Sequence, residues 1–224
     1  MLTSISKGYS LVKTKIGAIT VPVDPEIPPT PVEEMVGATA NIQEFDFGVI
    51  TYRWQQDSGV NLETRTWIST PSRPGYTVGN ERQQSDLTYL KWGKPPASVY
   101  TETVLIDMSN IIRDHAGNPV ININMSGYWY NSVNSGNLNI ELITYKGGYM
   151  VDNSTSIWSN VGGVPVQSLK LPVTTKMYVN GDSNGQDLAM LSYTVASKTG
   201  VLIRAVGAEP LKPPLEEPPV EDSP

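Results

Sequence analysis

The residues that could do acid–base chemistry are few in this chain of 224 residues. Its one histidine, His115, follows Asp114 in a turn-like stretch, and the chain has no cysteine. A catalytic triad would pair the imidazole with a carboxylate and an activated serine, but one histidine beside an aspartate in a loop is common by chance. Without a thiol or a pair of histidines, we expect no catalytic residue and no enzyme activity. We expect His115 to be a solvent-facing turn residue.

Residues 180–187 have the composition of a calcium loop. Side chains with oxygen atoms alternate before Gly185, and this spacing can place them around a hard cation. The register of an EF-hand fails, however, because the residue six positions after the glycine is Leu191 instead of a glutamate. Asparagine, aspartate and glycine are also the residues that β-turns favour. We therefore predict a turn here, with no metal site and no cofactor.

Three carboxylates on predicted strands are candidates for glycoside hydrolysis, which needs two of them across the scissile bond. Glu102 and Asp107 are an odd number of positions apart, so on one regular strand they point to opposite faces. Glu141 belongs to another predicted strand. We expect all three to be surface carboxylates of a sheet.

The tyrosines give the clearest binding signal. If Trp129 faces a core, Tyr128 and Tyr130 point the other way, next to Asn131 and, across a predicted hairpin, near Tyr145. Flat aromatic faces beside amides are typical of sugar-binding and protein-binding surfaces. A second sheet or a neighbouring subunit could instead cover them. The candidate ligand-binding or partner-binding residues are Tyr128, Tyr130, Asn131, Tyr145 and Tyr149.

Segments with period-2 alternation predict the elements that hold these residues. In residues 120–130, Ile121, Ile123, Met125 and Trp129 share one face, and residues 138–146 place Leu138, Ile140 and Leu142 on one face. We read these two segments as a hairpin, followed by a turn at Gly147-Gly148. Further strands are expected at 45–54, 98–109, 189–195 and 201–206, the last two joined by a turn at 197–200.

These strands predict an all-β fold, an antiparallel β-sandwich or jelly-roll-like domain over residues 35–208. Residues 55–97 carry weaker signals and are predicted to be long loops. One helical turn is expected near residues 111–115, before Pro119 ends it.

Both ends of the sequence read as extensions of this domain. Residues 1–34 combine a β-prone strip with five prolines between positions 22 and 31, which favour a polyproline II spacer. An exposed strip would be an edge-strand liability, so we expect a docking arm that adds a strand to a neighbouring subunit. The arm residues are Tyr9, Leu11, Ile16, Ile19 and Val21. Residues 209–224 alternate proline with carboxylates and predict an extended or disordered acidic tail.

The charge of the chain excludes one class of partner. The net charge is −6, but residues 35–208 carry 12 Lys and Arg against 13 Asp and Glu, so the acidity belongs to the two extensions. Nucleic-acid binding needs a clustered basic surface, and none is present. No apolar run approaches the roughly 20 residues of a membrane span, and no secretory signal is visible. We expect no nucleic-acid or membrane partner.

The order of several sequence blocks resembles a β-rich domain of structural proteins from large tailed bacteriophages. The resemblance covers residues 89–206 and is carried by Lys91-Trp92-Gly93, residues 99–107, residues 123–132 with Tyr128-Trp129-Tyr130, residues 144–150 with Lys146-Gly147-Gly148, and the closing strand 188–193.

This resemblance implies a non-enzymatic virion protein, such as a head decoration, a neck or tail accessory protein, or a fibre-associated module. It would be made in the host cytoplasm, lie on the virion surface, bind other virion proteins and form a homo-oligomer. The alternative is a carbohydrate-binding module that recognises host or mucosal glycans with the same fold and the same tyrosines. A virion protein should associate with particle proteins, whereas a lectin should bind a sugar alone.

Overall fold

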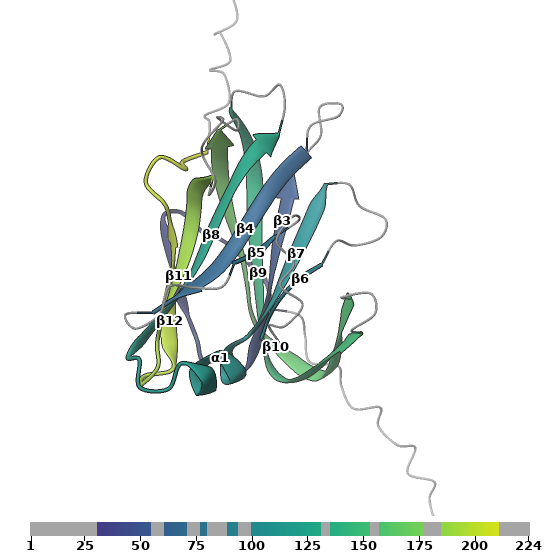
Figure 1. Cartoon of the computed structure of the whole chain (residues 1–224), viewed down its shortest axis with the longest axis vertical. Coiled ribbons are helices and arrows are strands. Elements are labelled where there is room, and N and C mark those ends of the chain that lie inside the picture. The colour runs from purple at the N-terminus through teal and green to yellow at the C-terminus, as the bar shows by residue number, and fades with distance from the viewer. Residues whose placement is uncertain are drawn as a thin grey trace, which may run out of the picture.

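The fold is known from a computed structural model, which describes residues 31–54, 61–70, 77–79, 89–93, 100–130, 135–152, 157–176 and 185–210. Twelve strands and one short helix lie in these ranges (Figure 1). Their bounds are β1 Glu33–Met35, β2 Thr39–Ile42, β3 Phe47–Trp54, β4 Asn61–Ser69, β5 Thr77–Gly79, β6 Leu90–Gly93, β7 Thr101–Asp107, α1 Met108–Asp114, β8 Val120–Tyr130, β9 Ser135–Asp152, β10 Ile157–Lys176, β11 Gln186–Thr194 and β12 Thr199–Arg204.

The strands form two six-stranded sheets that pack face to face. Sheet A has the order β1-β10-β9-β3-β7-β6, and sheet B has the order β2-β12-β11-β8-β4-β5. Every pairing is antiparallel except that of β1 with β10, which is parallel. The prediction of an all-β, largely antiparallel sandwich is confirmed.

The core between the sheets follows the alternation of the sequence. Alternate residues of β8 and β9 point inward, as expected when one face of a strand is buried. The predicted inward residues are all at most 4% exposed, which confirms the register: Ile121, Ile123, Met125, Trp129, Leu138, Ile140 and Leu142. The predicted connection between β11 and β12 is also present as an antiparallel pair, but its turn covers residues 195–198, two residues before the predicted 197–200.

The predicted hairpin between residues 120–130 and 138–146 is wrong. β8 pairs with β4 and β11 in sheet B, whereas β9 pairs with β3 and β10 in sheet A. The chain therefore crosses from one sheet to the other between β8 and β9. Alternation tells which face of a strand is buried but not which strand lies beside it, so two facing strands with matched apolar sets look like hairpin partners.

The prediction of long loops over residues 55–97 is also wrong, because β4, β5 and β6 lie in this range. β4 is a nine-residue strand between β8 and β5. Its inward positions are Leu62, Thr64, Thr66 and Ile68, all at most 1% exposed. Two of these four are threonines, which removed the apolar alternation that marks a strand.

The strand β9 does not turn at Gly147-Gly148. It continues to Asp152 and pairs with β10 throughout, with a register shift opposite Gly148 at Val161 and Gly162. Two residues of β10, Val161 and Gly162, therefore form a bulge opposite the single residue Gly148 of a continuing β9. Beyond β3, whose last partner on β9 is Tyr145, only β9 and β10 remain paired. We call this two-stranded part, residues 146–152 and 157–164, the ribbon; Figure 1 shows it leaving the sandwich at the lower right.

The helix α1 is longer than the single turn expected near residues 111–115. The strand β7 ends at Asp107, which caps the helix, so Met108 lies in the first turn and not in the strand. Met108 and Ile111 are fully buried, which closes one end of the sandwich.

The predicted arm meets the described structure only at its end. Glu33 and Glu34 lie in β1, so the last two residues of the predicted arm belong to sheet A. Residues 1–30 and 211–224 lie outside the described residues, and with them lie all five arm residues, Tyr9, Leu11, Ile16, Ile19 and Val21.

Candidate functional site

The predicted tyrosines do not form one surface. Tyr128 lies on β8 in sheet B, whereas Tyr145 and Tyr149 lie on β9 in sheet A. The separation follows from the crossing between β8 and β9, which places the two groups on opposite outer faces. Asn131 and the side chain of Tyr130 lie outside the described part of the chain.

Tyr128 is covered, although it points away from the core. Its exposed fraction is 6%. The Arg65 guanidinium carbon lies 5.5 Å from the centre of the Tyr128 ring, and Arg65 Nη2 donates to the tyrosine hydroxyl at 3.4 Å. Gly185 packs so close to the ring that an added Cβ would lie 2.9 Å from it. The ring is therefore enclosed by its own chain.

Tyr145 and Tyr149 belong to an aromatic cluster on the outer face of sheet A. Tyr145 stacks on Phe47, its cross-strand neighbour, with ring centres 4.7 Å apart and planes 3° apart. Tyr149 lies against the same Phe47 at 5.2 Å. Phe47 is 1% exposed and Leu105 beside it is also 1% exposed, so the two half-buried tyrosines cover an apolar patch. Burial raises the pKa of Tyr145.

The hydroxyl of Tyr149 joins this cluster to the helix cap. It donates to Asp107 Oδ2 at 2.6 Å, and the other carboxylate oxygen of Asp107 accepts from the backbone N–H of Asn110 at 2.9 Å. One carboxylate thus caps α1 and holds the base of the ribbon. Burial, followed by the interaction with Asp107, raises the pKa of Tyr149 well above its usual value.

A second anchor fixes the bend of the ribbon. Asp46 Oδ2 accepts from the backbone N–H of Gly147 at 2.8 Å, and Lys146 Nζ lies 3.4 Å from Asp46 Oδ1. Lys146 also pairs with Glu44 at 2.8 Å, and the hydrogen bonds that Glu44 accepts from Lys146 and from Lys198 lower the pKa of Glu44. Gly147 has φ +107, and an added Cβ would lie 2.8 Å from the Gly162 carbonyl oxygen, so glycine is needed here.

Beyond these anchors the ribbon exposes apolar side chains. Val161 and Val164 of β10 are 51% and 42% exposed. Met35 of β1 and Val32 before it are 60% and 91% exposed, and β1 pairs with β10 next to the ribbon. These four side chains follow one edge of sheet A from β1 into the ribbon.

Glu102 was expected on the surface, and this expectation is wrong. It points between the sheets, is 1% exposed, and accepts hydrogen bonds from Thr64 Oγ1 and from Trp92 Nε1, the latter at 3.3 Å. Beside it, the Tyr52 hydroxyl lies 2.7 Å from Thr66 Oγ1, and burial raises the pKa of Tyr52 well above its usual value. This polar cluster joins the two sheets inside the core, where no substrate can reach the carboxylate.

The other two carboxylates have separate partners. Asp107 is 6% exposed, so the surface expectation is wrong for it too, because the helix cap and Tyr149 enclose it. It lies on the side of sheet A opposite to Glu102, as the odd spacing predicted. Glu141 is on the outer face of sheet A in an ion pair with Arg53 at 3.1 Å. The three do not form the facing pair that glycoside hydrolysis requires.

His115 was expected to face solvent, and this expectation is also wrong. It is 4% exposed, ends α1 as its C-cap, and packs edge-on against Tyr89 with ring centres 6.3 Å apart. Asp114 before it is exposed, so the two side chains lie in different environments.

The glycine-rich stretch before β11 has two spacings that could suggest chemistry. Gly181 to Gly185 matches Gly-x-Ser-x-Gly, but a nucleophile elbow needs a helix after the glycine. Here the strand β11 begins at Gln186. Leu191, which stands where an EF-hand has its glutamate, is fully buried in the core. Residues 180–184 lie outside the described part, and the described residues contain no group of three metal-ligating side chains.

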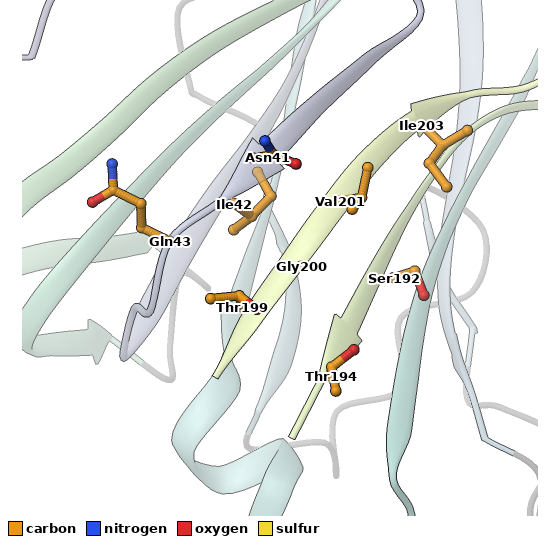
Figure 2. A pocket seen from close by; sticks show the side chains of 9 residues that line it. All are labelled: Asn41, Ile42, Gln43, Ser192, Thr194, Thr199, Gly200, Val201 and Ile203. Atoms are coloured by element: carbon orange, nitrogen blue, oxygen red, sulfur yellow. The ribbon is translucent and has the colours of Figure 1, made fainter. Parts of the chain in front are cut away.

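An open groove of about 530 Å³ crosses the outer face of sheet B over β2, β12 and β11 (Figure 2). Val201 and Ile203 give it an apolar lining, and the remaining side chains in it are hydroxyls, amides and Ile42. The lining has no charged group for acid–base work and no aromatic ring on which a sugar could stack. The groove was not predicted, because its residues come from three strands whose pairing the sequence does not reveal.

Comparisons with known proteins add no relative: neither the family models, nor the curated proteins, nor the solved structures gave a significant match. Among the described residues, no helix is long and apolar enough to cross a membrane.

Proposed function

We propose that this chain is a non-enzymatic structural protein of a tailed phage particle, which docks on neighbouring particle proteins. The observation that carries the proposal is the ribbon, which continues beyond the sandwich with Val161 and Val164 exposed. The resemblance of residues 89–206 to structural proteins of large tailed phages supports the same class. In this proposal the protein is made in the host cytoplasm and lies on the virion surface, as a head decoration, a neck or tail accessory protein, or a fibre-associated module.

The physical argument rests on how little supports the ribbon. A two-stranded hairpin alone is marginally stable in water, and three or more strands or a packed face are needed for independent stability. The base of the ribbon is held by Tyr149, Asp107 and Asp46. Residues 150–152 of β9 and 157–159 of β10 pair with each other and with no other described strand. A neighbouring protein that covers this part would remove exposed apolar surface and complete the backbone pairing.

The tyrosines do not favour the glycan alternative. Tyr128 is enclosed by Arg65, and one face of Tyr145 is stacked on Phe47. The groove on sheet B has no aromatic lining. What supports docking is therefore the edge of sheet A and the ribbon.

The proposal is tested on purified particles. Mass spectrometry should detect the chain at a fixed ratio to the major particle proteins, and the reconstructed density should place the ribbon against a neighbour. The variants Val161→Lys and Val164→Lys should lower the amount recovered with particles, because a charge on each side chain would have to be buried.

The matched control is Val206→Lys. It makes the same substitution at a valine that is 98% exposed in the turn after β12. It should assemble like the unchanged chain. Absence of the chain from particles, or equal recovery of all three variants, would contradict the proposal.

A further inference from the structure

One side of the sandwich brings together the strands β1, β10 and β2, and most of its backbone edge is already closed. β1 pairs with residues 168–170 of β10, and Thr174 N donates to the Ala208 carbonyl oxygen at 3.0 Å. The Gln167 side chain closes the edge of β2: its Oε1 accepts from Gln43 N at 2.7 Å and its Nε2 donates to the Asn41 carbonyl oxygen at 3.1 Å. An amide thus takes the place of a further strand.

The earlier part of β10 lacks such a cover. Residues 157–162, 164 and 165 pair with β9 on one side, and on the other side no described strand pairs with them. We call these residues the open edge. Natural sheets usually shorten, charge or cover an edge, because a free edge is a template for another chain. The open edge carries no Lys, Arg, Asp or Glu, it has one proline, Pro165, which lacks an N–H, and it includes the exposed Val161 and Val164.

We propose that the open edge receives residues 9–21 of a second copy of this chain as an added strand. The inference rests on the proposed docking function and names its partner and acceptor. It makes the protein a homo-oligomer in which each copy gives one arm and accepts one.

The position of β1 argues against a copy using its own arm. β1 runs parallel to β10 from Glu33, opposite Ser168, so an added strand continued backward from β1 in the same register would run along the open edge. The residues that would lie there are 22–32, and five of these eleven are prolines. Proline has no N–H to give to a ladder, so this segment cannot complete the edge. The strand-prone residues 9–21 begin only beyond it.

Length and stiffness fit an exchange between copies. Residues 22–31 span about 31 Å if they form a polyproline II spacer at about 3.1 Å per residue, which carries the strip away from its own edge. Residues 9–21 span about 43 Å as a strand at about 3.3 Å per residue, more than the roughly 33 Å of the open edge.

The chemistry of the two segments is also compatible. Residues 1–23 contain three lysines and no carboxylate, while β1 at the end of the open edge carries Glu33 and Glu34. The side chains Leu11, Ile19 and Val21 share one face of a strand and can cover apolar surface such as Val161. An uncharged acceptor does not repel the lysines.

Cross-linking in the full chain tests the acceptor directly, since the natural chain has no cysteine. One tagged copy carries Ile16→Cys, and a second copy carries Val164→Cys or, as control, Val206→Cys. A short bis-maleimide should join the arm to Val164→Cys several-fold more than to Val206→Cys. Equal yields at the two positions, or no cross-link between copies, would overturn the assignment.

Charge variants of the full chain give the second readout. Leu11→Asp with Ile19→Asp should shift the protein from oligomer to monomer in light scattering. Ser10→Asp with Thr20→Asp adds the same charge to the other face and should keep the oligomer. A monomeric unchanged chain, or equal behaviour of both pairs, would overturn the inference.

The two proposals fail differently. In one outcome, the arm variants and Val164→Cys behave like their controls, but particles contain the chain and lose it with Val161→Lys. In that case a foreign particle protein occupies the open edge. The docking function then stands and the second copy as partner is wrong.

Discussion

The pair β9–β10 passes through two environments along its length. From Leu138 to Tyr145, β9 lies between β3 and β10, and alternate side chains are buried against sheet B. In the ribbon the same two strands have no other described strand beside them, and Val161 and Val164 are exposed. The comparison teaches that strand pairing alone does not bury a strand. A strand is buried when it has neighbours on both edges and a facing sheet, and no described strand gives the ribbon either of these.

The largest expected difference between the two parts is in the cost of removing an apolar side chain. Ile140→Ala should destabilise the protein by about 2–5 kcal/mol, because it empties a fully buried site. Val164→Ala should change the free energy of unfolding by at most about 0.5 kcal/mol, as is usual for exposed positions. Urea unfolding of both variants measures this. Similar losses would show that the ribbon is packed as tightly as the sandwich.

The bend between the two parts should be the next most sensitive feature. Gly147→Ala should cost about 1–3 kcal/mol, because alanine at φ +107 is strained and its Cβ would press on the Gly162 carbonyl. Gly37→Ala is the control, since nothing lies within 4 Å of its added Cβ. Thermal unfolding and hydrogen exchange of residues 146–152 measure the effect. A Gly147→Ala variant as stable as the control would mean that the bend is adaptable.

The anchor of the ribbon should contribute less. Tyr149→Phe keeps the contact with Phe47 but loses the hydrogen bond to Asp107, so we expect a loss of about 1 kcal/mol. Hydrogen exchange should accelerate in residues 148–152 and stay unchanged at Leu138–Leu142. Uniform acceleration in both segments would show that the two parts unfold as one unit.

The last expected effect is absent at neutral pH and appears only at alkaline pH. Burial raises the pKa of Tyr149 above its usual 10 and that of Tyr193 to about 12. These tyrosines ionise first in the unfolded chain, so their contribution is complete below pH 10 and is lost as the pH rises toward the folded-state values. Stability should therefore fall above pH 10. Thermal unfolding from pH 8 to 11.5 measures the fall, which should be shallower in Tyr149→Phe and in Tyr193→Phe; unchanged slopes would exclude both tyrosines.

For β8 and β9, the sequence predicted which side chains point inward better than it predicted which strands pair with them. The alternation in β8 and β9 gave the buried residues correctly, because burial on one face needs only period 2. It could not show that the two strands face each other across the core. The turn at Gly147-Gly148 failed for a related reason, since glycine permits a bulge within a strand as readily as a turn.

The polar interior was hidden from the sequence. Thr64 and Thr66 made β4 look like a loop, and Glu102 looked like a surface carboxylate. Their hydrogen-bond partners lie on the facing sheet, since Thr64 donates to Glu102 and the Thr66 hydroxyl bonds to that of Tyr52. With Trp92, such a cluster depends on four strands meeting, β3, β4, β6 and β7, which no local pattern of one strand reveals. The open edge was hidden in the same way, because it depends on which strands lie beside β10 in the fold.

The parallel pairing of β1 with β10 has a consequence for how the molecule is oriented. Glu33 lies opposite Ser168 and Ala208 lies beside Thr174, so the chain enters and leaves the sandwich within six residues of one strand, roughly 20 Å. The strands β5 and β6, at the other side of the two sheets, carry neither connection. Tethers joined before residue 33 and after residue 208 therefore start from the same flank. A label or cargo placed on the β5–β6 flank would face away from both tethers.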